Sequence, residues 1–272
     1  VQGPAAALRW LAYWLNRLLL RGFFRLRIVG GEHLPRQGRF VLVANHVSDI
    51  DPPVLAAALP YATARRLHWS GVAERLFSTP LRRRLARLFN IFPVEERRPG
   101  RTLALAGAVL EQGRALVWFP ESWRSPDGRL QRFLPGVGRL LRDWPEVSVI
   151  PTYIDGAFAA MPRSRNWPRP VRITVRFGPA VRPEELLKKG QGAEEELRIV
   201  NALHRYVKRL AEQGGVEMVQ DKAPAEPAGG SLATPEEVRV LVGEIEDASL
   251  AAILALRPTP AEVEAAVAWS LG

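Results

Sequence analysis

Residues 39–53 read RFVLVANHVSDIDPP, an apolar run that passes into a polar loop and then into two prolines. The run at 39–44 is rich in Val and Phe and is typical of a buried β-strand. Proline suits the first turn of a helix because its φ angle is already helical, so we expect a helix over 52–59. The stretch therefore predicts strand, loop and helix in that order, the unit from which α/β domains are built.

The same alternation continues on both sides of this unit. Further strands are predicted at 24–29, 90–94, 114–119, 147–153 and 171–177. Further helices are predicted at 80–89, 101–112, 136–143 and 193–212. We therefore expect an α/β fold with a mostly parallel sheet flanked by helices. In such sheets catalytic and ligand-binding residues usually lie on the loops that follow the strands.

Composition excludes some chemistry and divides the chain. The absence of cysteine excludes disulfides, thiolate metal sites and a cysteine nucleophile. Residues 1–214 hold 35 basic and 18 acidic residues, a net charge of +17, whereas residues 215–272 hold three basic and ten acidic, a net charge of −7. We predict four segments: an amphipathic membrane-interface helix at 1–23, the α/β domain at 24–214, a Pro- and Ala-rich linker at 215–230 and a small three-helix, all-α module at 231–272.

The N-terminal segment has one apolar side when it is drawn as a helix. Six leucines share an arc: Leu8, Leu11, Leu15, Leu18, Leu19 and Leu26. Arginines and tryptophans share the opposite arc: Arg9, Arg17, Arg21, Arg25, Trp10 and Trp14. This pattern is typical of a helix that lies in a membrane interface. The alternative is a helix whose leucines pack on the domain core. No run reaches the roughly 18 apolar residues needed to span a bilayer.

The loop after the strand at 39–44 holds a histidine and a carboxylate five positions apart, His46 and Asp51. The carboxylate can accept the imidazole N–H and leave the other ring nitrogen free as a base. Two alternatives stay open: Asp51 before Pro52 also suits a helix N-cap, and Asp49 competes as the partner of His46. No second histidine stands at metal-ligand spacing, so no metal is expected.

The loop after the strand at 114–119 carries Glu121, Arg124 and Ser125. Arg124 can hold a phosphate through two parallel hydrogen bonds. The alternative is a surface ion pair between Glu121 and Arg124. Further arginines cluster at 82–84, 87, 97, 98 and 101, and a solvated charge run is the simplest interpretation of any one of them.

Four ordered blocks carry a family resemblance. Asn45, His46 and Asp51 form an Asn-His pair followed by four residues and Asp, and residues 119–125, FPESWRS, are similar to a Phe-Pro-Glu-Gly-Thr-Arg-Ser block. The other two blocks are NIFPVEERR at 90–98 and VIPTY around Pro151. Over about residues 24–212 the chain thus resembles the lysophosphatidic acid acyltransferase family, the bacterial 1-acylglycerol-3-phosphate acyltransferases.

The resemblance implies a catalytic pair, His46 as general base and Asp51 as the group that orients it. It implies that five residues bind substrate: Asn45, Arg97, Glu121, Arg124 and Ser125. The chain departs from the family pattern at Ser122-Trp123, which replace Gly-Thr, and at Glu96, where an arginine usually follows the acidic residue. The phosphate-binding role is therefore given to Arg97 rather than Arg98.

The resemblance also implies the partners: an acyl carrier protein or coenzyme A thioester as donor, a lysophospholipid as acceptor, and an anionic membrane surface. No cofactor, metal or nucleic acid is expected, and the protein is expected to lie peripherally on the cytoplasmic face of the cell membrane. Two alternatives remain: the same chemistry on glycerol-3-phosphate or a lyso-aminolipid, and a non-enzymatic basic protein that binds lipid or nucleic acid.

Overall fold

The computed structural model describes residues 3–94, 98–214 and 232–242, together with residues 247, 250, 251 and 254. The chain divides into two compact units, residues 1–217 and residues 218–272. The predicted linker at 215–230 and much of the predicted three-helix module lie outside the described residues.

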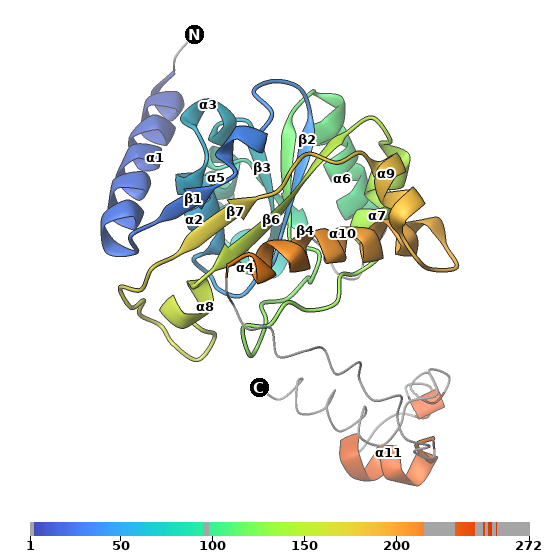
Figure 1. The fold of residues 1–272 in the computed structure, drawn as a ribbon. Helices are drawn as coiled ribbons and strands as arrows, with labels where there is room; N and C mark the ends of the chain where they lie inside the picture. The colour runs from blue at the N-terminus through green and yellow to red at the C-terminus, as the bar shows by residue number, and fades with distance from the viewer. Residues whose placement is uncertain are drawn as a thin grey trace. The chain divides into compact units, whose positions relative to one another are not determined.

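A seven-stranded sheet forms the centre of the first unit (Figure 1). Its strands are β1 (Arg27–Val29), β2 (Phe40–Ala44), β3 (Leu67–Val72), β4 (Ile91–Val94), β5 (Ala115–Trp118), β6 (Ser148–Asp155) and β7 (Thr174–Phe177). They lie in the order β1-β7-β6-β2-β5-β3-β4, and all neighbours are parallel except the antiparallel pair β6 and β7. The predicted α/β fold with a mostly parallel sheet is confirmed.

Helices cover both faces of this sheet (Figure 1). They are α1 (Pro4–Phe23), the 3-10 turn η1 (Gly31–His33), α2 (Asp51–Ala58), α3 (Tyr61–Ala64), α4 (Ala73–Leu76), α5 (Pro80–Leu88), α6 (Pro99–Glu111), α7 (Gly136–Asp143), α8 (Ala157–Ala160), α9 (Pro183–Lys189) and α10 (Glu195–Glu212). Phe40 and Leu42 of β2 pack in one core cluster with Leu55 of α2. Val41, between them in the strand, points to the opposite face, so β2 is buried from both sides.

The sequence prediction missed one strand of the sheet, β3. Its residues LHWSGV alternate apolar and polar side chains over four positions only, too short a run to mark a strand, and only Leu67 and Gly71 are buried. The strand is held instead by its two parallel neighbours, β4 and β5. Because such pairing depends on long-range contacts, it leaves little signal in the local pattern.

Helix α1 packs on the domain through its polar side. The Tyr13 hydroxyl donates to the carbonyl of Leu59 at 2.7 Å, and Arg17 donates to the carbonyls of Ala57 and Leu59. Asn16 donates to the carbonyl of Pro53 at 2.9 Å. The polar side is therefore the side that holds α1 against α2.

The apolar side of α1 faces solvent, with Leu18 73% exposed and Leu8, Leu11, Leu15 and Leu19 each more than half exposed. The alternative in which the leucines pack on the core is therefore wrong for these five, whereas Leu26, which follows the helix, does pack against the core. The arginines are also divided differently from the prediction, because Arg9 and Arg17 contact the domain while Arg21 and Arg25 are exposed. Among the helices that the structure describes, none is long and apolar enough to cross a membrane.

In the second unit, helix α11 (Pro235–Val242) begins with a capping box. The backbone N–H of Thr234 donates to the Glu237 carboxylate at 2.8 Å, and the backbone N–H of Glu237 donates to the Thr234 hydroxyl at 3.3 Å. Each side chain thus satisfies a backbone donor that the first helical turn leaves unpaired. The helix thus has Thr234 as N-cap and Pro235 as its first helical residue.

Candidate active site

The loop between β2 and α2 places His46 against Asp51. The Nδ1 atom of His46 lies 2.8 Å from Oδ2 of Asp51, and the same oxygen accepts the backbone N–H groups of Val47 at 2.7 Å and Ser48 at 2.8 Å. The Asp51 side chain is fully buried, whereas the His46 side chain is 19% exposed. A carboxylate beside Nδ1 assigns the ring proton to that nitrogen, so Nε2 carries the free lone pair that a general base needs.

Asp51 is not the helix cap that its place before Pro52 suggested. Helix α2 begins at Asp51 itself, and Ile50 occupies the N-cap position without a capping side chain. The carboxylate instead turns back onto the loop that precedes the helix, where it accepts from Val47 and Ser48. The second alternative, Asp49 as the partner of His46, is also wrong, because Asp51 occupies that place.

Two buried polar side chains fasten this loop to the sheet. The Asn45 amide donates to the carbonyl of Ile154 at 3.1 Å and accepts its N–H at 2.7 Å, which uses both polar ends of the side chain on β6. The Ser48 hydroxyl donates to the carbonyl of Met161 at 2.6 Å. These contacts position the residues on either side of His46 and favour a structural role for Asn45.

The loop after β5 lies directly against the histidine loop. Oε1 of Glu121 accepts the backbone N–H of His46 at 3.1 Å, and the backbone N–H of Ser125 donates to the carbonyl of His46 at 2.8 Å. The ring of Phe119 stacks on the imidazole, with centroids 4.4 Å apart. Phe119 was missed as a site residue because an aromatic side chain at a strand end resembles any core residue.

Glu121 is buried and bound to backbone on both sides. Its Oε2 accepts the N–H of Gln131 at 3.4 Å, and only 5% of the residue is exposed. Burial raises the pKa of Glu121 to about 8, because loss of water disfavours the charge more than the two backbone N–H groups favour it, and the Asp51 charge adds to the rise. The carboxyl is therefore a group that orders the two loops.

The raised pKa makes stability depend on pH through Glu121. The folded protein holds this proton up to about pH 8, whereas the unfolded chain releases it near its ordinary pKa of 4.5. The contribution of Glu121 to stability is therefore lost as pH rises between these values, by at most about 5 kcal/mol at 1.4 kcal/mol per pKa unit. We expect Glu121→Gln to flatten the fall in unfolding free energy between pH 5 and pH 9, measured by urea denaturation. The exposed residue Glu111, changed to Gln, serves as control, and equal slopes in both variants would contradict this assignment.

Arg124 pairs with Asp49 and not with Glu121. Its Nη1 atom lies 2.9 Å from Oδ2 of Asp49, with the Arg124 side chain 19% exposed and that of Asp49 41% exposed. The predicted surface pair between Glu121 and Arg124 is therefore wrong. The pairing places a guanidinium at the rim of the same loop that carries His46, where an anionic group of a substrate can replace the aspartate.

Of the other residues predicted to bind substrate, one braces the loop, and one is not described by the structure. The Ser125 hydroxyl donates to Asp127 at 3.0 Å and the residue is fully buried, so it braces the loop. Ser122 has a φ of 64°, a left-handed conformation that favours the glycine of the family pattern. Arg97 lies outside the described residues. Within the described part of the chain, no group of three or more His, Asp or Glu residues is placed to hold a metal ion.

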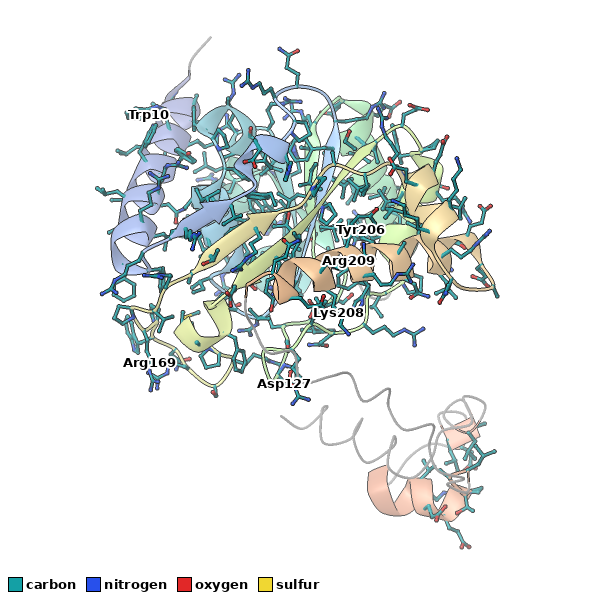
Figure 2. All side chains as sticks on the ribbon, in the orientation of Figure 1. Trp10, Asp127, Arg169, Tyr206, Lys208 and Arg209 are labelled. Atoms are coloured by element: carbon teal, nitrogen blue, oxygen red, sulfur yellow. The ribbon has the colours of Figure 1, made fainter. Side chains whose placement is uncertain are left out.

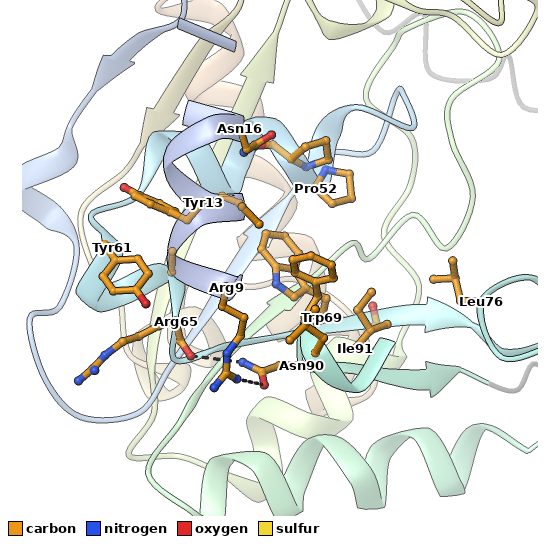
Figure 3. Close-up of a pocket in the computed structure, with 17 residues that line it drawn as sticks. Arg9, Tyr13, Asn16, Pro52, Tyr61, Arg65, Trp69, Leu76, Asn90 and Ile91 are labelled. Carbon is orange, nitrogen blue, oxygen red and sulfur yellow. Dashed lines mark hydrogen bonds between the residues drawn. The ribbon is translucent and has the colours of Figure 1, made fainter. Parts of the chain in front are cut away.

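An apolar cavity of about 400 Å³ begins at Pro52 and Pro53, directly after Asp51 (Figure 3). Its lining comes from α1, α2, α3, α4, β3, β4 and the residues at the end of α5, and it includes Tyr13 and Trp69. A volume of this size lies in the range of small-molecule sites. The apolar cavity therefore lies beside the loop that carries His46.

The fold and the site define a class: an α/β domain with a histidine–carboxylate pair at a strand end and an arginine beside it. Residues 25–155 of this chain are similar to the family model for acyltransferases.

Individual proteins are also similar to this chain. Two relatives named 1-acyl-sn-glycerol-3-phosphate acyltransferase, from Limnanthes douglasii and Limnanthes alba, are each 27% identical over 165 residues, which cover 59% of this chain and 56% of the relative. The chain thus spans just over half the length of these relatives. The crystal structure of the 1-acyl-sn-glycerophosphate (LPA) acyltransferase PlsC from Thermotoga maritima is similar over 76% of this chain and 81% of that one, with a TM-score of 0.59 and 25% identity.

Proposed function

We propose that the protein is an O-acyltransferase that moves a fatty acyl group from a thioester to the free hydroxyl of a lysophospholipid, with 1-acyl-sn-glycerol-3-phosphate as acceptor and phosphatidic acid as product. The donor is an acyl carrier protein or coenzyme A thioester. The observation that carries the proposal is the 2.8 Å contact between His46 and the buried Asp51. The names of the similar proteins support the choice of acceptor.

The proposed reaction follows from the free nitrogen of His46. Nε2 takes the proton of the acceptor hydroxyl as the oxygen attacks the thioester carbonyl and a C–O bond forms. The tetrahedral intermediate then expels the thiolate as the C–S bond breaks. The imidazolium returns its proton to the sulfur, so the acceptor proton ends on the released thiol. Asp51 stabilises the imidazolium between these steps through Nδ1.

Arg124 is the proposed anchor for the acceptor phosphate, and Arg97, outside the described residues, is proposed as a second. In the structure Arg124 pairs with the partly exposed Asp49, so a dianionic phosphate that binds Arg124 replaces a weak surface partner with a stronger one. The hydrogen bonds between the two loops keep this anchor at a fixed place relative to His46.

We expect Arg124→Lys to raise the KM for lysophosphatidic acid about tenfold, because an ammonium cannot reproduce the planar fork of a guanidinium. The KM for the acyl donor should stay within about twofold, since the proposed role of Arg124 is to bind the acceptor phosphate and not the donor. Steady-state kinetics with each substrate varied in turn measures both values. The exposed Arg163→Lys serves as control. Equal losses for donor and acceptor would contradict the phosphate role and point to a structural one.

The direct test of the proposed function is acyl transfer. The protein is incubated with radiolabelled acyl thioester and lysophosphatidic acid, glycerol-3-phosphate or a lyso-aminolipid in parallel. Transfer to lysophosphatidic acid supports the proposal. Transfer to one of the other acceptors would keep the chemistry and change the substrate, an outcome for which Ser122-Trp123 in place of Gly-Thr is the specific reason. Transfer to none of them would favour the non-enzymatic alternative.

We also propose that α1 lies in the surface of an anionic membrane, peripherally and on the cytoplasmic face. Support comes from its exposed leucines and from Trp10 and Trp14, which are 50% and 44% exposed. Exposed indole rings on such a helix favour the boundary between headgroups and acyl chains. A substrate that is itself a membrane lipid is then within reach of the site.

We expect Leu15→Asp combined with Leu18→Asp to weaken binding to phosphatidylglycerol vesicles at least about tenfold, because each buried leucine contributes roughly 1.5–3 kcal/mol. Deletion of the helix is the poorer experiment, since Tyr13 and Arg17 hold it to the domain. Co-sedimentation measures the binding, and Leu134→Asp, at a residue that is 46% exposed outside α1, is the control. Unchanged binding in a folded variant would refute the proposed orientation of α1.

A further inference from the structure

Helix α5 exposes its apolar side in the same way as α1. Leu81 is 67% exposed, Leu85 is 45% exposed, and Phe89, which follows the helix, is 43% exposed. At 100° per residue these side chains share one arc, and Ala86, the one residue of α5 that is buried, lies about 100° away from the centre of that arc. The helix therefore packs on the domain through Ala86 and leaves Leu81 and Leu85 exposed, while Leu88 lines the cavity.

The same helix is strongly basic. It carries four arginines, Arg82, Arg83, Arg84 and Arg87, and no acidic residue. Arg83, Arg84 and Arg87 are exposed, and no carboxylate of the described residues lies within ion-pair distance of them. Exposed arginines around exposed leucines and a phenylalanine give a surface that attracts anions and at the same time favours apolar contact.

The end of α5 lies beside α1 across the apolar cavity. Leu88, Phe89 and Asn90 line the cavity together with Arg9 and Tyr13 of α1. The guanidinium of Arg9 donates to the Asn90 side chain at 3.5 Å, a contact drawn in Figure 3. The side of α1 that contacts the domain and the end of α5 therefore border the same cavity.

We propose that α5 is a second membrane-contacting element, which inserts Leu81, Leu85 and Phe89 into the surface of an anionic bilayer while its arginines bind lipid phosphates. This inference rests on the proposed membrane location of α1 and extends it to a segment about 60 residues further along the chain. Near-surface arginines contribute about 1 kcal/mol each when the lipid is anionic. Two separated contacts fix the rotation of the domain about α1, and hence the direction in which the cavity opens.

An acidic carrier protein is the alternative binding partner for the four arginines of α5. The bilayer is favoured because α5 exposes Leu81, Leu85 and Phe89 among its arginines, and electrostatic docking of a small acidic protein does not require large exposed apolar side chains. The two occupants are separated by experiment, since only the bilayer takes apolar side chains into hydrocarbon.

The first test uses the lack of cysteine in the chain, which allows a single label to be placed at will. Leu85→Cys carries an environment-sensitive fluorophore, and Lys188→Cys on α9 carries it as control. With phosphatidylglycerol vesicles we expect a blue shift and quenching by quencher-bearing lipid at position 85 only. A label at position 85 that stays in water on vesicles that bind the protein would overturn the proposal.

The second test reverses charge. Arg83→Glu with Arg84→Glu is compared with Lys188→Glu with Lys189→Glu, which changes the net charge equally on the opposite side of the sheet. We expect the α5 variant to bind phosphatidylglycerol vesicles about tenfold or more weakly than the control variant. Unchanged vesicle binding together with a raised KM for an acyl carrier protein thioester would assign α5 to the carrier protein instead and overturn the proposal.

A third measurement separates this inference from the proposed function. Acyl transfer to a water-soluble, short-chain lysophosphatidic acid reports on the active site without a membrane, and the α5 variants should retain it. If the wild-type protein shows no transfer while position 85 still enters the bilayer, the proposed function fails and the membrane contact stands. If transfer is normal and position 85 stays in water, the reverse holds.

Discussion

His46→Ala is expected to lower kcat by roughly 10² to 10⁴, the range that a positioned general base contributes. The reason is that Nε2 of His46 is the atom that takes the hydroxyl proton in the proposed reaction, and Asp51 already holds the other ring nitrogen. The loss should appear at saturating concentrations of both substrates, because the imidazole acts on the reacting atoms and does not anchor either substrate.

The measurement is steady-state acyl transfer together with a thermal melt. His68→Ala is a matched control, since His68 is also partly buried, lies on β3 rather than on the loop after β2, and hydrogen-bonds through its ring to backbone at Arg66 and Ala115. We expect the control to keep its activity. Undiminished turnover in the His46 variant would contradict the general-base role. Loss of wild-type activity with a chelator, and its restoration by zinc, would indicate a metal-dependent reaction instead.

Asp51→Ala is expected to lower both turnover and stability. One buried carboxylate oxygen accepts from His46, Val47 and Ser48, and hydrogen bonds to a charged group are worth about 1.5–3 kcal/mol each. We therefore expect the unfolding free energy to fall by at least about 2 kcal/mol, more than the roughly 1 kcal/mol of a lost helix cap. The fall in kcat should approach that of the His46 variant, because the imidazole loses its orientation.

Urea denaturation and steady-state kinetics at one pH separate the two effects. Asp49→Ala is the control, as a carboxylate two positions away that is 41% exposed and pairs with Arg124. Its unfolding free energy should change by less than about 1 kcal/mol. If Asp51→Ala kept wild-type kcat, His46 would not need a carboxylate to act, and the proposed pair would be refuted.

Local sequence patterns predicted most of the sheet and the right pair of loops. The strand at β2 and the loop that follows it are visible because apolar and polar residues change over abruptly at Asn45. Strand β3 was missed because its burial comes from neighbours distant in the chain. The partner of Arg124 was missed for the same reason, since Asp49 lies 75 residues earlier in the chain and only the fold brings the two together.

The sequence also showed which side of α1 is apolar and could not show where that side points. Periodicity finds a stripe of leucines, but packing on the core and contact with a lipid surface demand the same stripe. The hydrogen bonds of Tyr13 and Arg17 with backbone carbonyls at the end of α2 decide the matter, and these depend on the tertiary structure.

The backbone of His46 is bonded at both its N–H and its carbonyl to the loop that carries Arg124. His46, the proposed base, and the loop that carries Arg124, the proposed phosphate anchor, therefore form one rigid unit. A change that shifts either loop displaces both residues. Selection for a new acceptor is then expected to leave this frame alone and to act on side chains that border it without belonging to it. Asp49 and Trp123, both partly exposed, are such positions, so divergence in acceptor choice within this scaffold should concentrate there.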